Sequence, residues 1–102
     1  MMSLTHVDHI AIESNDIANS VDWYKTNFRC QVKHQDSTWA LLSFENIQIA
    51  LVTPGEHPPH FAVVDKSVAN QQNKKTHRDG IHYIYEEDPD NNVIEKIDRG
   101  TS

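Results

Sequence analysis

The stretch that decides the fold is VDHIAIESNDIANSVDWYKTNF, residues 7–28. Its start alternates as a β-strand does, with Ile10 and Ile12 on one face and His9 on the other. After a polar turn at 14–16, apolar residues recur at spacings that fit the 3.6-residue period of a helix: Ile17, Val21, Tyr24 and Phe28. One face of the strand can therefore bury against the helix, while the opposite face carries His9.

Both ends of this helix can be placed from local chemistry. Asp16 is a good N-cap, because its carboxylate can accept from the free amides of the first turn. The helix is expected to end near Asn27 or Phe28. No glycine follows to take a left-handed backbone conformation, so Asn27 is the predicted terminator.

The rest of the chain is predicted to form mainly strands separated by turn residues. Glu45-Asn46 is a two-residue hairpin connection, Pro54-Gly55 ends a strand, and 88–92 is a tight turn. Residues 65–73 are polar enough to give one or two helical turns at most. The predicted strands are 5–13, 30–35, 38–44, 47–53, 60–64, 81–87 and 93–98.

This order of elements indicates an internal duplication, a βαβββ unit repeated with its second copy shortened. HIAI opens the first unit at 9–12, and HFAV opens the second at 60–63. The prediction is an α+β fold, with modules at about 5–54 and 58–98 inside a single domain spanning 1–102.

Composition excludes several classes of partner. The formal net charge is −6, whereas nucleic-acid binding needs clustered Lys and Arg. No apolar run approaches the roughly 20 residues that span a bilayer. The single cysteine, Cys30, is expected to be a small buried or half-buried apolar residue. We expect a soluble cytoplasmic protein that binds neither nucleic acid nor membrane.

Four segments together resemble the vicinal oxygen chelate superfamily, which includes glyoxalase, bleomycin-resistance and extradiol-dioxygenase proteins. They are VDHIAI at 7–12, the D-I-x-x-S-V-x-W-Y helix at 16–24, PPHFAV at 58–63 and DPDNNVIE at 88–95. The resemblance covers nearly the whole chain. It implies paired βαβββ modules that form a cupped mixed β-sheet, a small-molecule ligand and a homodimer.

The resemblance also implies metal ligands at His9, His60 and Glu95. Alternation agrees, because each lies on the strand face that need not pack on a helix. Many members carry a fourth ligand at a position that aligns with Ala50, which cannot coordinate. Gln48 is on the same face two residues earlier and is the candidate for that role. Two histidines and a carboxylate suit Fe(II), Mn(II), Ni(II) or Zn(II) with open coordination positions.

Other chemically capable side chains receive weaker predictions. Trp39 and Tyr85 are candidates to line a substrate pocket, together with Tyr83. Trp23 and Tyr24 are expected in the core or at an interface. The remaining histidines are expected at the surface or in loops: His6, His34, His57, His77 and His82.

The first functional hypothesis is a glyoxalase-like, metal-dependent lyase or isomerase that acts on a small, oxygen-rich, bidentate substrate. A second is a metal-free protein that binds or sequesters a small molecule, as bleomycin-resistance proteins do. Thiol transfer and ring-cleaving oxygenation are further alternatives. The intact ligand triad favours the first hypothesis, and the alanine at position 50 favours the second.

Overall fold

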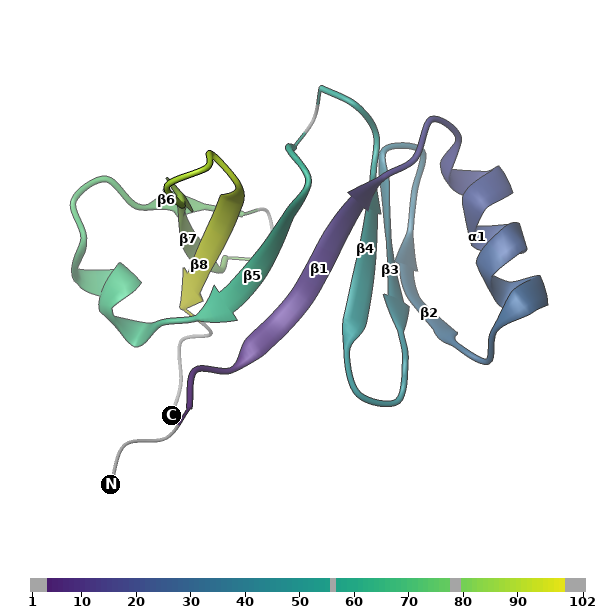
Figure 1. The fold of residues 1–102 in the computed structure, drawn as a ribbon, viewed down its shortest axis with the longest axis horizontal. Coiled ribbons are helices and arrows are strands. Elements are labelled where there is room, and N and C mark those ends of the chain that lie inside the picture. Colours follow the sequence, from purple (N-terminus) through teal and green to yellow (C-terminus); the bar gives the residue numbers. More distant parts are fainter. Residues whose placement is uncertain (1–3, 56, 78–79, 99–102) are drawn as a thin grey trace. The chain divides into compact units, whose positions relative to one another are not determined.

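The computed structural model describes residues 4–55, 57–77 and 80–98. These residues contain one α-helix, one short 3₁₀ helix and eight strands, which makes the fold α+β (Figure 1). In chain order the elements are β1 Val7–Glu13, α1 Ile17–Asn27, β2 Gln31–Gln35, β3 Trp39–Ser43, β4 Gln48–Val52, β5 His60–Val64, η1 Lys66–Asn70, β6 Lys75–Thr76, β7 His82–Glu87 and β8 Val93–Asp98. Each predicted strand is present, with ends within two residues of the prediction.

The chain divides into two compact units, one of His9–His60 and the other of Met1–Asp8 with Phe61–Ser102. In the His9–His60 unit the strand order is β2-β3-β4-β1. β1 pairs with β4 in parallel, while β3 pairs with both β2 and β4 antiparallel, so the sheet is mixed. Phe44 and Ile47 close the β3–β4 hairpin through a 2.9 Å backbone hydrogen bond, as predicted for Glu45-Asn46.

The core of this unit lies between α1 and one face of the sheet. Its buried members are Ile17, Val21, Ala40, Leu42 and Leu51. Ile12 and Tyr24 pack against them, which confirms the predicted strand face and most of the helix stripe. Cys30 packs there as well and is half-buried, as expected. Phe28 is 48% exposed, so the buried stripe ends before it.

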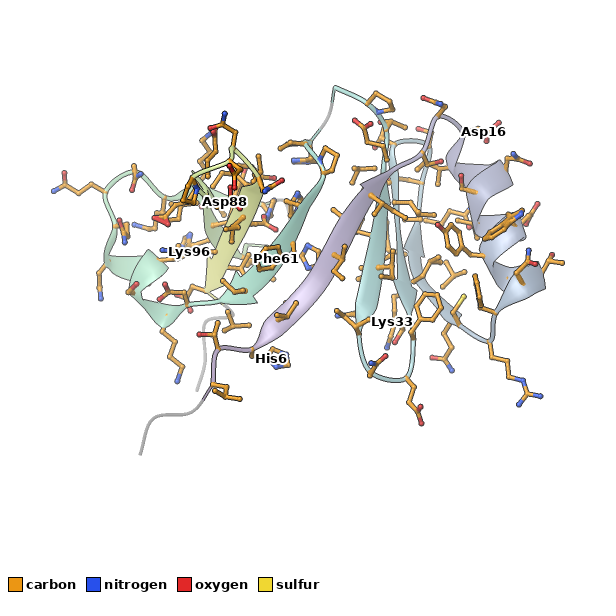
Figure 2. All side chains as sticks on the ribbon, in the orientation of Figure 1. His6, Asp16, Lys33, Phe61, Asp88 and Lys96 are labelled. Carbon is orange, nitrogen blue, oxygen red and sulfur yellow. The ribbon has the colours of Figure 1, made fainter. Side chains whose placement is uncertain are left out.

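A side chain caps the start of α1, whereas an extended backbone ends it. Asp16, labelled in Figure 2 at the start of the helix, accepts a hydrogen bond from the amide of Asn19 at 3.1 Å and is the N-cap. The helix ends at Asn27, as predicted, but the end is not formed by a left-handed residue, because among the described non-glycine residues only Asn91 has positive φ. Instead Phe28 turns extended, with its amide bonded to the Tyr24 carbonyl and its ring against Phe44.

The second unit repeats the connectivity of the first. Its strand order, β5-β8-β7-β6, corresponds to β1-β4-β3-β2 in the other unit. The 3₁₀ helix η1 stands where α1 stands in the first copy, and its Val68 is fully buried. The duplication and the shortened second copy are therefore confirmed. The two-residue strand β6 was not predicted from sequence.

The turn between β7 and β8 fixes the position of the last strand. The carboxylate of Asp88, labelled in Figure 2, accepts from the amides of Asp90 and Asn92 at 2.8 and 2.9 Å. Asn91 supplies the left-handed residue, with φ of 68°. This closed turn sets the antiparallel register in which Tyr85 lies opposite Glu95.

Within the residues that the structure describes, no helix combines the length and the apolar character needed to cross a membrane.

Candidate metal centre

Two of the three predicted ligands, His9 and His60, lie side by side in the His9–His60 unit. Both are half-buried, and their ring centroids are 5.7 Å apart in an edge-to-face arrangement. A ring nitrogen of His9 and one of His60 lie within 4.8 Å of each other. Two imidazole nitrogens that share a tetrahedral zinc ion are about 3.4 Å apart. Small rotations of the two rings would therefore bring both nitrogens to one ion.

The backbone orients the His60 ring. Its Nδ1 lies 2.7 Å from the carbonyl oxygen of Pro58. A carbonyl only accepts, so Nδ1 carries the proton and Nε2 is the basic nitrogen of the neutral ring. Histidines that ligate metals are commonly oriented in this way through the nitrogen that does not bind the ion.

Strand register decides which side chain lies beside His9. In the parallel pairing of β1 with β4, His9 is opposite Gln48, while Ala11 is opposite Ala50. Paired residues in neighbouring strands lie about 4.8 Å apart and present their side chains on the same face. The polar neighbour of His9 is therefore Gln48. Ala50 is 5% exposed and lies beside Ala11, two residues further along the same face of β4.

The third predicted ligand, Glu95, is a buried carboxylate in the second unit. It is 2% exposed, and its Oε2 lies 2.6 Å from Nε2 of His77. Glu95 is therefore not a solvated surface carboxylate. Lys96, labelled in Figure 2, points to the opposite face of β8 and pairs with Glu86 at 2.8 Å.

His77 is the site residue that sequence reasoning missed. It is expected at the surface or in a loop, and it does lie in the connection after β6, but it is half-buried there and its Nε2 lies 2.6 Å from Oε2 of Glu95. Its ring stacks on that of Tyr83, with centroids 3.7 Å apart and planes 6° from parallel. No local pattern marks this residue, because the contact depends on the unpredicted strand β6, which pairs antiparallel with β7.

Tyr83 and Tyr85 lie on the same face of β7 as the carboxylate of Glu95. Burial, and then the negative charge of Glu95, raise the pKa of Tyr83. The same two causes, with a smaller contribution from Tyr83, raise the pKa of Tyr85 further. Both phenols therefore keep their protons at neutral pH, and each remains a hydrogen-bond donor.

Two aromatic predictions have different outcomes. Trp39 lies on the sheet face away from the α1 core and stacks on His34, with centroids 4.2 Å apart. Ser43 pairs with Gln48, and Trp39 is four residues from it along β3, roughly 13 Å away. The pocket role of Trp39 stays a prediction. Trp23, expected in the core or at an interface, is 55% exposed and so lies outside the core.

His9 and His60 offer imidazole nitrogens in one unit, and Glu95 offers a buried carboxylate in the other, so the chain carries the types of donor that hold metal ions. Two imidazoles and one carboxylate are ligands that Fe(II), Mn(II), Ni(II) and Zn(II) all accept. The orientation of His60 by a carbonyl, and of Glu95 by His77, matches the outer-shell hydrogen bonds found around bound metals. The donor chemistry therefore fits a divalent cation.

Comparison with known proteins identifies the fold. No family model and no curated protein matches this sequence. A glyoxalase/bleomycin resistance protein/dioxygenase superfamily member from Vibrio splendidus 12B01 matches with TM-score 0.69 and 12% identity, over 93% of this chain and 99% of that one. Methylmalonyl-CoA epimerase from Streptomyces coelicolor matches with TM-score 0.72 and 17% identity, over 97% and 100%. A structure named NAD-dependent benzaldehyde dehydrogenase, from Legionella pneumophila, gives 0.70 and 15%, over 87% and 96%.

At these identities the similarity establishes the fold. The fold that the resemblance to the vicinal oxygen chelate superfamily implies is confirmed by the similarity to the superfamily member and to the epimerase. The activities in the names of the three proteins differ, and one fold commonly hosts several functions. The function of this chain therefore has to be argued from its own residues.

Proposed function

We propose that this protein is a divalent-metal-dependent isomerase or lyase that acts on a small molecule with two adjacent oxygen atoms. His9, His60 and Glu95 would be the protein ligands. The observation that carries the proposal is the paired arrangement of His9 and His60, with rings 5.7 Å apart and the His60 tautomer fixed by a backbone carbonyl.

Gln48 favours a metal-dependent enzyme over a metal-free binding protein. The gap at Ala50 was the main support for the metal-free alternative. Register instead places Gln48 beside His9, and its side-chain carbonyl oxygen is a competent fourth ligand. Gln48 would then supply the fourth ligand that Ala50 cannot provide.

The charge of the donor set indicates a substrate class. Two neutral imidazoles and one carboxylate leave a divalent ion with a net positive charge and open positions. When bound, the ion would act as a Lewis acid toward two adjacent substrate oxygens. Bidentate molecules are therefore favoured, and anionic ones such as 2-oxo acids or malonyl-type thioesters are favoured over neutral 2-hydroxy carbonyl compounds.

The chain's own residues supply the positioning. His60 is held by the Pro58 carbonyl and Glu95 by His77, so neither ligand has to be ordered when the centre forms. Tyr85 keeps its proton at neutral pH and could donate a hydrogen bond to a substrate oxygen that becomes negative.

Isomerase or lyase chemistry is favoured over oxygenation by two considerations. The second unit carries only the short helix η1 in place of α1, which leaves little chain to enclose a large substrate. Methylmalonyl-CoA epimerase, one of the structural neighbours, is named for an isomerisation. The first consideration limits the size of the substrate, and the second favours an isomerisation over an oxygenation.

Metal binding is the first test. Metal-free protein is titrated with Mn(II), Fe(II) under anaerobic conditions, Ni(II) and Zn(II), and the stoichiometry and Kd are measured by calorimetry. Wild type should bind one ion per chain, while His9→Ala and His60→Ala should lose binding. His6→Ala is the matched control, since His6 is exposed. Wild type that binds no metal, or ligand variants that bind like His6→Ala, would contradict the proposal.

The reaction class is tested by solvent exchange. Loaded protein in D₂O is incubated with methylmalonyl thioesters, 2-hydroxy ketones and 2-oxo acids, and loss of the α-proton signal is followed by NMR. The proposal expects metal-dependent exchange with at least one class. Full metal occupancy without exchange of any of them would exclude α-proton chemistry for these substrates while leaving the metal centre in place.

A homodimer belongs to the same proposal. A chain of this length buries only about 60–65% of its unfolded surface, so a partner copy would add apolar burial. Trp23 and Phe28 are exposed neighbours whose rings lie 5.9 Å apart. Light scattering should give twice the chain mass, and a monomer at micromolar concentration would contradict this part.

A further inference from the structure

The hydrogen bond from His77 to Glu95 is short and engages a buried carboxylate. The Nε2–Oε2 distance is 2.6 Å, and Glu95 is 2% exposed. An ionised carboxylate only accepts, so Nε2 of His77 donates. A charge-assisted hydrogen bond at such a site restricts rotation of the carboxylate about its last bond.

The imidazole of His77 is itself held on two sides. Its ring stacks face to face on Tyr83, with centroids 3.7 Å apart. Its amide donates to the Ile81 carbonyl, and its own carbonyl accepts from the Gly80 amide, both at 2.9 Å. Gly80 has φ of +90°, a conformation that side chains rarely adopt, so this closed turn depends on glycine. The donor is therefore fixed before any ligand arrives.

We propose that His77 is a positioning residue that presents the Glu95 carboxylate to the metal through a single oxygen. This inference rests on the proposed metal centre and adds a residue to it. With Oε2 occupied by His77, ligation through Oε1 alone leaves the hydrogen bond intact. Ligation through both oxygens would make Oε2 share its lone pairs between the ion and the proton of His77, which would weaken that hydrogen bond.

A purely structural role makes a different prediction. If the pair served only to satisfy a buried carboxylate, its removal would lower stability and leave the metal affinity of the folded protein unchanged. A positioning role instead weakens metal binding in protein that is still folded. Loss of such an outer-shell partner commonly weakens metal affinity about 10–100-fold.

The test compares side chains at position 77 that do and do not donate. His77→Gln places an amide near the position of Nε2, while His77→Met has similar length without a donor. His82→Met is the matched control, because His82 lies on the opposite face of β7 and bonds the Thr76 hydroxyl at 3.0 Å. Mn(II) and Co(II) Kd values are measured by calorimetry. The visible spectrum of the Co(II) protein reports ligand geometry, and circular dichroism reports folding.

We expect His77→Met to weaken binding about 10–100-fold and to change the Co(II) spectrum. His77→Gln should stay within about threefold of wild type, and His82→Met should match wild type in both readouts. Equal Kd values for His77→Met and His82→Met would overturn the inference, as would a folded His77→Gln variant as weak as His77→Met.

Two other outcomes are also decisive. If wild type binds no metal, the proposed centre itself fails, which is distinct from a failure of His77 alone. If His77→Met does not fold, His77→Asn takes its place, because its shorter amide cannot reach Oε2. Restoration by Gln but not by Asn supports positioning, and equal binding by the two overturns it.

Discussion

Gln48 lies beside His9 in the parallel pairing of β1 with β4, and the two side chains share the sheet face that α1 leaves uncovered. The register of the two strands sets this pair, and two residues further along β1, on the same face, Ala11 lies beside Ala50. A shift of a single residue would turn Gln48 to the opposite face of the sheet.

Gln48→Ala should weaken metal binding at least tenfold with little effect on folding, because it removes an oxygen beside His9 and Gln48 is only half-buried. Calorimetric Kd values for Mn(II) and Zn(II) provide the measurement. Gln31→Ala, an exposed glutamine on β2, is the control and should bind as wild type does. If the two variants bind equally, Gln48 is not part of the centre.

Leu42→Ala should lower the free energy of unfolding by about 2–5 kcal/mol, since the removed atoms leave a cavity in the α1 core. Leu42 is 0% exposed. Leu4→Ala is the same chemical change at a side chain that is 95% exposed, and it should stay within about 0.5 kcal/mol of wild type. Urea unfolding measures both changes through a shift in midpoint at constant slope. Similar losses in the two variants would mean that Leu42 is not in the core.

Asp36 gives the protein an acid-sensitive contact. The hydrogen bond from His34 at 2.9 Å, and then the amides of Thr38 and Trp39, hold the pKa of the Asp36 carboxyl well below its ordinary value of 3.8. At low pH the unfolded chain therefore binds more protons at this position than the folded chain does. The stabilisation is present above about pH 4 and is lost as pH falls from there.

Asp36→Asn should remove this dependence, since an amide does not titrate. Urea unfolding between pH 6 and pH 3 should show a smaller loss of unfolding free energy on acidification in the variant than in wild type. Asp22→Asn, at an exposed position of α1, should retain the wild-type loss. Parallel curves for wild type and Asp36→Asn would contradict the assignment.

Asp16→Ala should cost about 1 kcal/mol, because the amide of Asn19 loses the carboxylate oxygen that caps α1. Asp22→Ala is the control, because its expected change in the free energy of unfolding has the opposite sign or is zero. Asp22 is exposed inside the helix, where alanine has the higher helix propensity, so this change should be neutral or slightly stabilising. Thermal unfolding followed by circular dichroism distinguishes the two. A loss of stability in Asp22→Ala as large as in Asp16→Ala would argue against a capping role.

Local sequence patterns specify the face of His9, but they specify neither the neighbour of His9 nor the contact between His77 and Glu95. His9 could be assigned to the face opposite Ile12, because alternation within a strand is a local property. The partner of His9 could not be assigned, since it depends on how β1 aligns with a strand almost forty residues further along the chain. His77 could not be linked to Glu95 for a similar reason, because the contact needs the short strand β6 and a turn that closes on Gly80.

The sequence by itself therefore determined α1, every strand except β6, and the faces of the strands. Hydrophobic period, the Asp16 cap and the 88–92 turn are set by neighbouring residues, and the repeated βαβββ order follows from them. Only the tertiary structure decided that Gln48 accompanies His9 and that His77 holds Glu95. Those pairings depend on strand register and on burial across distant segments, which local backbone preferences do not specify.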